Sequence, residues 1–199
     1  MKYFYYGTLF FLILIIGSCE SNKDAGNNSP QKIGFKIDPA LLSEPYHDSA
    51  LGMIFSPPKG CSQMPGDMVF KIKNQLKTQA AMSVPFTIEP HQVFLNEENH
   101  FACLLSRLPS LANSDSAVCI YRQAILDTSS VKQVKQTVFL HNGFTIYQIL
   151  TIDQKKIEFK LIIPQSGNRS FQIDYVVPKS IYADYIEVIE SSIGSIKKL

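Results

Sequence analysis

The chain has 199 residues, a formal net charge of +2 at pH 7 and 45% hydrophobic residues. Its basic residues are scattered among acidic ones, so the sequence lacks the cationic stripe typical of nucleic-acid-binding proteins, and no nucleic-acid partner is expected. A chain of this length buries roughly 70% of its unfolded surface, which is enough for one stable domain without disulfides or metals.

An apolar run opens the chain from Phe4 to Ile16, broken only by a glycine and a threonine. It is shorter than the roughly 20 residues that a membrane-spanning helix needs. Lys2 precedes it, and the small residues Gly17 and Ser18 follow it. This is the pattern of a secretory signal that is removed by cleavage.

The order Ile16-Gly17-Ser18-Cys19 resembles the bacterial lipobox, in which the cysteine receives diacylglycerol and becomes the new N-terminus. Residues 1–18 are therefore expected to be a lipoprotein signal peptide. Cys19 is expected to carry the acyl chains, palmitate among them, that hold the protein in a membrane. The alternative is an ordinary signal peptide with a coincidental cysteine.

The segment from Cys19 to residue 32 is predicted to be a flexible tether, because it has too few apolar side chains to offset the entropy of ordering itself. Glu20 stands where an inner-membrane lipoprotein of a diderm bacterium usually has aspartate. We therefore expect a protein of the bacterial cell envelope that is lipid-anchored in the outer membrane. Residues 33–199 are expected to form a single globular domain.

Short elements are predicted in the first part of this domain. Leu51 to Pro58 reads as a strand that ends in a Pro-Pro-Lys-Gly turn. A helix is expected from Asp67 to Gln79, with Met68, Ile72 and Leu76 on its apolar stripe. Further strands are predicted at 86–88, 93–95 and 100–108, and a second helix at 115–126.

The second part of the domain has clearer periodicity. Apolar side chains alternate in Phe144–Ile152, Ile157–Ile163 and Phe171–Val177, and a strand at 137–140 leads into the first of these through Asn142-Gly143. The segment 181–199 has apolar residues at helical spacing, with Ser180 as the expected N-cap. These elements predict an α+β fold with a mostly antiparallel sheet.

Three stretches resemble the PsbP-like superfamily, which is named for an extrinsic photosystem protein and includes bacterial lipoproteins and a eukaryotic Ran-binding protein. They are ALGMIFSPPKG, NGFTIYQI and FQIDYVVPKSIYADYIEVIESSIGSIK, which begin at residues 50, 142 and 171. The resemblance covers residues 51–199, and Cys61 stands where such proteins often have tryptophan. It implies an α/β/α sandwich with a central antiparallel sheet, a long C-terminal helix and docking to other proteins.

Cys61, Cys103 and Cys119 remain within the domain. Their spacing matches neither a C-x-x-C redox pair nor a zinc site. Buried free thiols are expected, and the alternative is a disulfide between Cys103 and Cys119.

No catalytic motif is visible, so neither an enzyme nor a cofactor is expected. The histidines His47, His91, His100 and His141 lack metal-binding spacing. His47 precedes Asp48, but neighbours on an extended segment point to opposite sides. Nucleophile elbows, S-x-x-K motifs and glycine-rich phosphate loops are also missing from the sequence.

Tyr147, Tyr182 and Tyr185 are the candidate interaction surface, because tyrosine combines apolar area with a polar tip and is enriched at interfaces. The alternative is that these rings pack in the core. The expected function is that of a membrane-anchored, non-enzymatic module that binds a protein partner. A lipoprotein that binds a lipid or small ligand between helix and sheet is the alternative, and a hydrolase with an unrecognised site is a third hypothesis.

Overall fold

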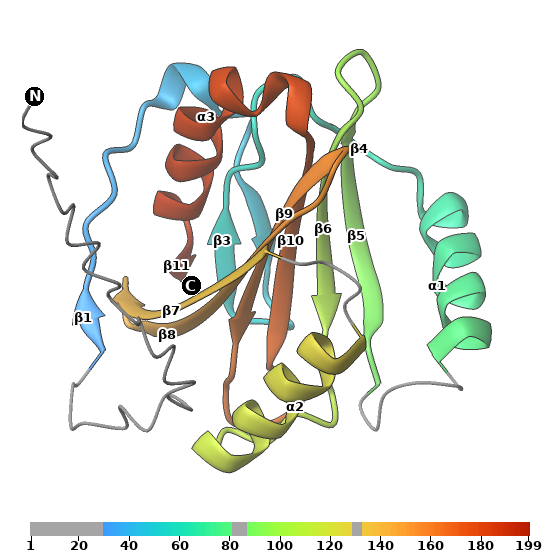
Figure 1. Cartoon of the computed structure of the whole chain (residues 1–199), viewed down its shortest axis with the longest axis vertical. Coiled ribbons are helices and arrows are strands. Elements are labelled where there is room, and N and C mark those ends of the chain that lie inside the picture. Colours follow the sequence, from blue (N-terminus) through green and yellow to red (C-terminus); the bar gives the residue numbers. More distant parts are fainter. Residues whose placement is uncertain (1–29, 81–86, 129–132) are drawn as a thin grey trace, which may run out of the picture.

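The computed structural model describes residues 30–80, 87–128 and 133–199 (Figure 1). Within these residues the helices are η1 (Pro39–Leu41), α1 (Gly66–Ala80), α2 (Asp115–Thr128), η2 (Lys179–Ile181) and α3 (Tyr182–Gly194), where η marks a 3-10 helix. None of the described helices is long and apolar enough to cross a membrane. The strands are β1 (Gln31–Lys32), β2 (Tyr46–Asp48), β3 (Met53–Phe55), β4 (Ser62–Gln63), β5 (Glu89–Asn96), β6 (Phe101–Arg107), β7 (Gln133–His141), β8 (Phe144–Ile152), β9 (Lys156–Ile163), β10 (Phe171–Pro178) and β11 (Lys197–Lys198).

Eight strands form one sheet in the order β1-β7-β8-β9-β10-β6-β5-β4. All of its neighbouring strands are antiparallel except β1 and β7, which are parallel. β1 and β4 are therefore the two opposite edges of this sheet. A second, smaller sheet has the order β11-β3-β2 and is antiparallel throughout.

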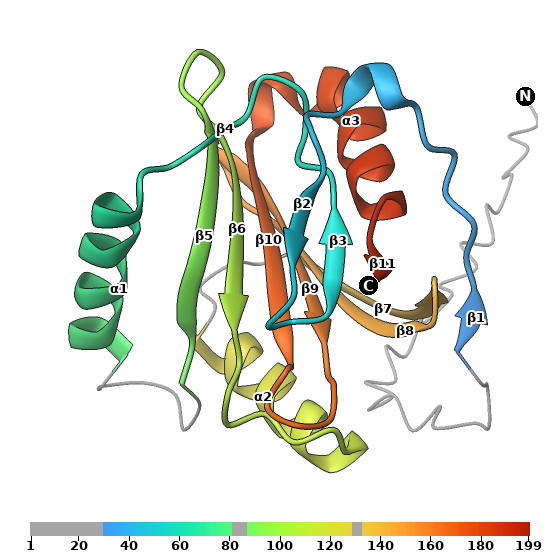
Figure 2. The ribbon, with the colours of Figure 1, turned by 180° about the vertical axis from the view of Figure 1, so that it is seen from behind.

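The large sheet is covered on both faces, which confirms the expected α+β sandwich. Alternate residues of β9, from Ile157 to Ile163, are buried in the main core on the face covered by α3 and the small sheet (Figure 2). Ile149 and Ile162 lie on the other face and pack with α2 in a second apolar cluster (Figure 1). α1 stands beside β5, near the β4 edge.

The turn between β7 and β8 has the geometry predicted from its Asn-Gly pair. Asn142 and Gly143 have φ angles of 46° and 79°. His141 pairs directly with Phe144, so the turn has two residues. Positive φ at both central positions defines a type I′ turn, whose twist matches that of the strands it joins.

The C-terminal segment differs from the prediction at both ends. Ser180 does not cap α3, because the chain first forms η2 and then enters α3 at Tyr182. α3 ends at Gly194, and Lys197 and Lys198 form β11 against β3 instead of a last helical turn. Pairing with β3 satisfies backbone groups that a frayed helix end would leave to water.

Two element boundaries and the burial of one helix also differ from the prediction in the first part. Gln31 and Lys32, predicted as the end of the tether, pair with β7 as strand β1. The two strands predicted at 86–88 and 93–95 are replaced by β5, which has an irregularity between Pro90 and Gln92; Phe86 lies outside the described residues. Among the described α1 side chains, those of residues 66–74, Val69 is buried and the predicted stripe residue Met68 is exposed, whereas Leu76 lies outside the described side chains.

The end of α3 lies against the segment that follows β1. A Cβ atom added to Gly194 would lie 2.7 Å from Cβ of Phe35 and 2.9 Å from Cγ1 of Ile37. Contacts this short do not occur between real side chains, so glycine is needed at this position for the close approach of the two segments.

We predict that Gly194→Ala lowers the free energy of unfolding by about 1–3 kcal/mol, because the new methyl group overpacks this contact. Urea unfolding followed by circular dichroism measures the change. Gly34→Ala is the matched control, since a Cβ atom there meets nothing within 4 Å. Equal stability of the two variants would contradict the prediction.

Candidate functional site

The three tyrosines predicted as an interaction surface do not lie together. Tyr182 and Tyr185 are half-buried on α3, on the main-core face of the large sheet. Tyr147 is on β8 and belongs to the cluster under α2, on the opposite face. Its hydroxyl donates to Oδ1 of Asp115 at 3.2 Å, and the Arg122 guanidinium lies 5.5 Å from its ring centroid. Tyr147 therefore cannot share one surface with the other two.

Tyr182 and Tyr185 contribute more to packing than to an open surface. The Tyr185 ring stacks on Phe101 at 5.4 Å, and its hydroxyl accepts a hydrogen bond from Nδ2 of Asn99 at 2.8 Å. The Tyr182 ring lies 6.1 Å from that of Phe159. Burial raises the pKa of both tyrosines above the ordinary value, and Glu190 adds to the effect at Tyr182. The alternative, that these rings pack in the core, fits these contacts better.

The β4 edge of the large sheet is hollowed on both faces. A depression of about 530 Å³ lies on the main-core side, lined by Tyr46, Lys59, Cys61, Gln63 and Phe94 among others. A second of about 470 Å³ lies on the α1 side, lined by residues that include Ser62, Met64, Met68, Leu95 and Glu98. We call these two hollows, with the strand between them, the β4 surface.

Backbone groups on this edge are directed outward. The Met64 amide donates to the Val93 carbonyl at 2.8 Å, so the hydrogen-bonding groups of Met64 point toward β5. Because these groups alternate along a strand, those of Gln63 point away from β5. The edge can therefore accept a further strand, although only over a short length.

Apolar and acidic side chains frame the second hollow. Met68, at the start of α1, is 47% exposed and lines it. Glu97 and Glu98 stand on its rim, in the exposed turn after β5. Phe70 is 62% exposed but lies on the other side of buried Val69, away from the hollow. The sequence held one signal of this exposure: Phe70 falls outside the predicted apolar stripe of its helix.

Asp48 is paired with His91 instead of with its neighbour His47. Nε2 of His91 lies 2.6 Å from Oδ2 of Asp48, whose side chain is only 4% exposed while that of His91 is 31% exposed. Oδ1 of Asp48 accepts from the Leu51 amide at 2.9 Å, and the Tyr46 hydroxyl donates to Oδ2 at 3.3 Å. Burial, followed by the charge of Asp48, raises the pKa of Tyr46 to about 12.

A buried carboxylate that orients a partly exposed imidazole is the arrangement of a general base. In the described part of the chain, however, no serine, threonine or cysteine side chain is hydrogen-bonded to His91. His91 is also not among the residues that line either hollow of the β4 surface. The pair connects β5 to the small sheet, and this is the role that its contacts support.

A charged network occupies the α2 face of the sheet. Nζ of Lys160 lies 2.6 Å from Oε1 of Glu158 and 3.2 Å from Oδ1 of Asp174. Asp174 also accepts two hydrogen bonds from Gln172, whose own oxygen accepts from the Tyr121 hydroxyl at 2.8 Å. Burial alone would lower the pKa of Lys160, but the two carboxylates raise it above its ordinary value. The network therefore holds Lys160 charged beneath α2.

The pKa values of the two carboxylates in this network are shifted in opposite directions. Burial raises the pKa of Asp174 even though Lys160 and Gln172 favour its charged form. Burial also acts to raise the pKa of Glu158, but Lys160 and Lys156 hold it below its ordinary value.

His141 joins the tip of the β7–β8 hairpin to two other segments. It is buried, with Nδ1 3.2 Å from the Ile33 carbonyl and Nε2 2.9 Å from the Gly194 carbonyl. Phe35 packs against its ring edge-on at 5.0 Å. These contacts extend its expected role as a hairpin residue. The described residues contain no group of three or more histidine, cysteine, aspartate or glutamate side chains arranged to hold a metal.

The predicted alternative of a Cys103–Cys119 disulfide is wrong, since all three domain cysteines are free. Cys103 is buried in the main core, whereas Cys119 is exposed on α2 beyond the opposite face of the sheet. Burial raises the pKa of Cys61 to about 12 and also raises that of Cys103. Two of the three are the buried free thiols that were expected.

Comparisons with known proteins show similarity at the level of solved structures. No protein-family model matches the chain, and no curated protein matches it. The chain is similar to the solution structure of cyanobacterial PsbP (CyanoP) from Synechocystis sp. PCC 6803, with 13% identity and a TM-score of 0.44. The match covers 87% of this chain and 99% of that chain.

We predict that Lys160→Met lowers the free energy of unfolding by about 3 kcal/mol at pH 7, because it leaves the buried Asp174 carboxylate without a cation and Glu158 with Lys156 alone. The pKa of Asp174, already raised by burial, then rises further in the folded state, so the loss of stability shrinks as the pH falls toward about 4. Urea unfolding at several pH values measures this. Lys156→Met is the control, because Lys156 is 49% exposed. A difference in free energy of unfolding that does not change with pH would contradict the proposed role of Lys160 in the network.

We predict that, of the three domain cysteines, only Cys119 reacts rapidly with Ellman's reagent in the folded protein, because buried thiols with raised pKa values form little thiolate. Cys61 and Cys103 are expected to react after unfolding in urea. Cys119→Ser should abolish the fast reaction. A fast thiol that persists in this variant and is lost in Cys19→Ser would show that Cys19 is unmodified.

Proposed function

We propose that this protein is a lipid-anchored protein of the bacterial cell envelope whose folded domain binds a protein partner without catalysing a reaction. The Ile16–Cys19 sequence supports the anchor, and the Glu20 that follows it favours the outer membrane. The residues up to β1 connect the anchor to the domain. The partner is proposed to bind at the β4 surface.

The observation that carries the proposal is the position of the two edges of the large sheet. β1, which follows the N-terminal segment directly, forms one edge, and β4 forms the other (Figure 1). Seven strand spacings of about 4.8 Å separate edges of an eight-stranded sheet by about 34 Å before twist is considered. A domain anchored through β1 would thus present its β4 surface away from the anchor.

The β4 surface fits an extended segment of a partner protein. A strand laid along Gln63 would place alternate side chains on opposite faces of the sheet, and each face has a hollow at that point. Met64, Met68 and Leu95 offer apolar contact in the second hollow. Glu97 and Glu98 on its rim favour a lysine or arginine next to the apolar residue.

The interface between α3 and the large sheet does not favour the lipid-binding alternative. Ile189, Ile193 and Ile196 are all almost completely buried there. The expected cleft between helix and sheet is filled at these positions by side chains of the main core.

A photo-crosslinking amino acid placed at Gln63 in living cells tests the proposal. We expect one reproducible protein adduct, and we expect Met68→Glu to reduce its yield at least about 10-fold, because a charge would enter the apolar hollow. Immunoblotting and mass spectrometry of the adduct give the yield and the partner's identity.

Two controls are matched to this design. Phe70→Glu changes an apolar residue on the same helix that is more exposed than Met68, and Ile120→Glu changes one on α2 that is 57% exposed. Both should leave the Gln63 adduct unchanged. No adduct at Gln63, or an equal loss with all three variants, would argue against binding at the β4 surface.

A further inference from the structure

Basic side chains gather at the end of the molecule where β1 begins. Lys32 comes from β1, Lys197 and Lys198 come from β11, and Arg169 comes from the loop between β9 and β10. All four are exposed. We call this group the cationic end. Because its members come from distant parts of the sequence, composition and charge spacing alone did not reveal it.

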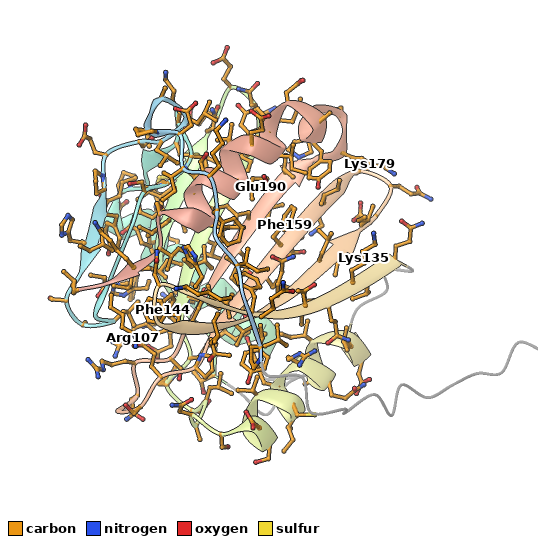
Figure 3. The ribbon with its side chains drawn as sticks, turned by 90° about the vertical axis from the view of Figure 1, so that its left-hand side faces the viewer. Arg107, Lys135, Phe144, Phe159, Lys179 and Glu190 are labelled. Atoms are coloured by element: carbon orange, nitrogen blue, oxygen red, sulfur yellow. The ribbon has the colours of Figure 1, made fainter. Side chains whose placement is uncertain are left out.

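Contacts place Lys32 and Lys198 around the β7–β8 turn, and Lys197 precedes Lys198 on β11. Lys32 is paired with Leu140, three residues before Gly143. A Cβ atom on Gly143 would lie 3.5–3.7 Å from the end of the Lys198 side chain, and the Lys198 ammonium lies 5.2 Å from the Phe144 ring centroid. Figure 3 looks onto this side of the molecule, with Phe144 labelled at one end of the β7–β8 hairpin and Lys135 at the other.

Arg169 reaches the same place through the turn before β3. A Cβ atom on Gly52 would lie 3.4 Å from Nη1 of Arg169. The Gly52 carbonyl in turn accepts a hydrogen bond from the amide of Leu199, next to Lys198. The β9–β10 loop, the small sheet and the β7–β8 turn thus meet at one end.

These cations have no carboxylate partner among the described residues. Within those residues, the ion pairs closer than 4.0 Å involve Lys73, His91, Lys156 and Lys160, and none involves the cationic end. An exposed cation without a counter-ion close by retains its attraction for an external anion.

A polar hollow of about 390 Å³ lies among them. Arg169 and Lys198 line it together with Asn113 and Ser166, whose side chains can donate hydrogen bonds. Gln165 also lines it, but its side-chain nitrogen donates to the carbonyls of Leu51 and Arg169. Asp115 lines it as well, and its Oδ1 accepts the Tyr147 hydroxyl. Two cationic side chains and one aspartate thus line this hollow, and the two cations suit the oxygens of a phosphate group.

The sequence supplies a reason why such phosphates would belong to lipid. Residues 20–30 separate Cys19 from β1, and a chain of 11 residues spans at most about 40 Å. A lipid anchor at Cys19 would therefore keep the cationic end close to a membrane surface at high effective concentration. Even weak attraction of each lysine or arginine to anionic lipid then suffices to orient the domain.

We propose that the cationic end rests on the anionic phosphate headgroups of the membrane that holds Cys19. This inference rests on the anchor of the proposed function. It adds a second, electrostatic contact that fixes how the domain stands on the membrane. The contact presents the β4 surface, at the opposite edge of the sheet, to the envelope space.

The test uses the chain from Cys19 onward, lipidated and reconstituted in vesicles. One set is pure phosphatidylcholine, and the other contains one-third phosphatidylglycerol. Lysine acylation followed by peptide mass spectrometry reports which amines are covered. We expect Lys32, Lys197 and Lys198 to be modified at least about fivefold more slowly on the anionic vesicles, and high salt to remove the protection.

Lys59 and Lys71, near the β4 edge, are the internal controls and should react equally on both vesicles. The variant Lys197→Glu/Lys198→Glu should lose the protection of Lys32, whereas Lys59→Glu should keep it. Equal reactivity of the cationic end on both vesicle types would overturn the proposal. Protection by inorganic phosphate without vesicles, to the same degree, would also overturn it in favour of a site for free anions.

Flotation on the phosphatidylcholine vesicles reports the anchor alone. Loss of flotation there would refute the anchor of the proposed function. The unlipidated chain, carrying Cys19→Ser, is footprinted on the anionic vesicles at low salt. Salt-sensitive protection of Lys32, Lys197 and Lys198 in that sample would support contact of the cationic end with anionic headgroups, whether or not Cys19 carries lipid. Absence of this protection would count against that contact.

Discussion

The arrangement of the other elements depends on the contacts of residues 191–196, which are the end of α3 and the two residues that follow it. The serine hydroxyls of this segment bond to the Asp38 amide, to the Ser56 backbone and to the Tyr175 hydroxyl. These groups belong to the N-terminal segment, to the residue after β3 and to β10 of the large sheet. The Gly194 carbonyl contacts His141 at the β7–β8 turn. Small side chains are needed here, because larger ones would separate the four segments that meet.

This junction explains how the N-terminal segment is held against the domain. β1 is only two residues long and would hold poorly by its own pairing with β7. Contacts of His141 and Gly194 with the segment after β1 add to that pairing. The N-terminal segment is therefore held by side-chain and backbone contacts in addition to the two-residue pairing of β1 with β7.

The sequence predicted the elements that have long periodic patterns. Strands β8, β9 and β10 have alternating patterns of eight or nine residues, and the turn between β7 and β8 has the specific dipeptide Asn142-Gly143. By contrast, β1, β4 and β11 have two residues each, which is too short for a detectable period. The pairing of Asp48 with His91 joins residues that no local pattern connects. Tyr147 could have been assigned correctly, because it alternates with the inward-facing Phe144 and Ile146 and so must face the other side.

The two hollows of the β4 surface result from the short length of the edge strand β4. The β4 surface arises because the sheet ends in a strand too short to cover the neighbouring β5, so Phe94 and Leu95 each line a hollow, one on each face. A longer edge strand would fill both hollows and would expose a longer row of unpaired backbone groups. Short edge strands limit unwanted pairing between sheets, and both edges of this sheet, β1 and β4, have only two residues. The two edges differ in their surroundings, because the segment after β1 packs against His141 and Gly194, whereas β4 lies between two hollows. This difference is the reason why the proposed partner segment is assigned to β4.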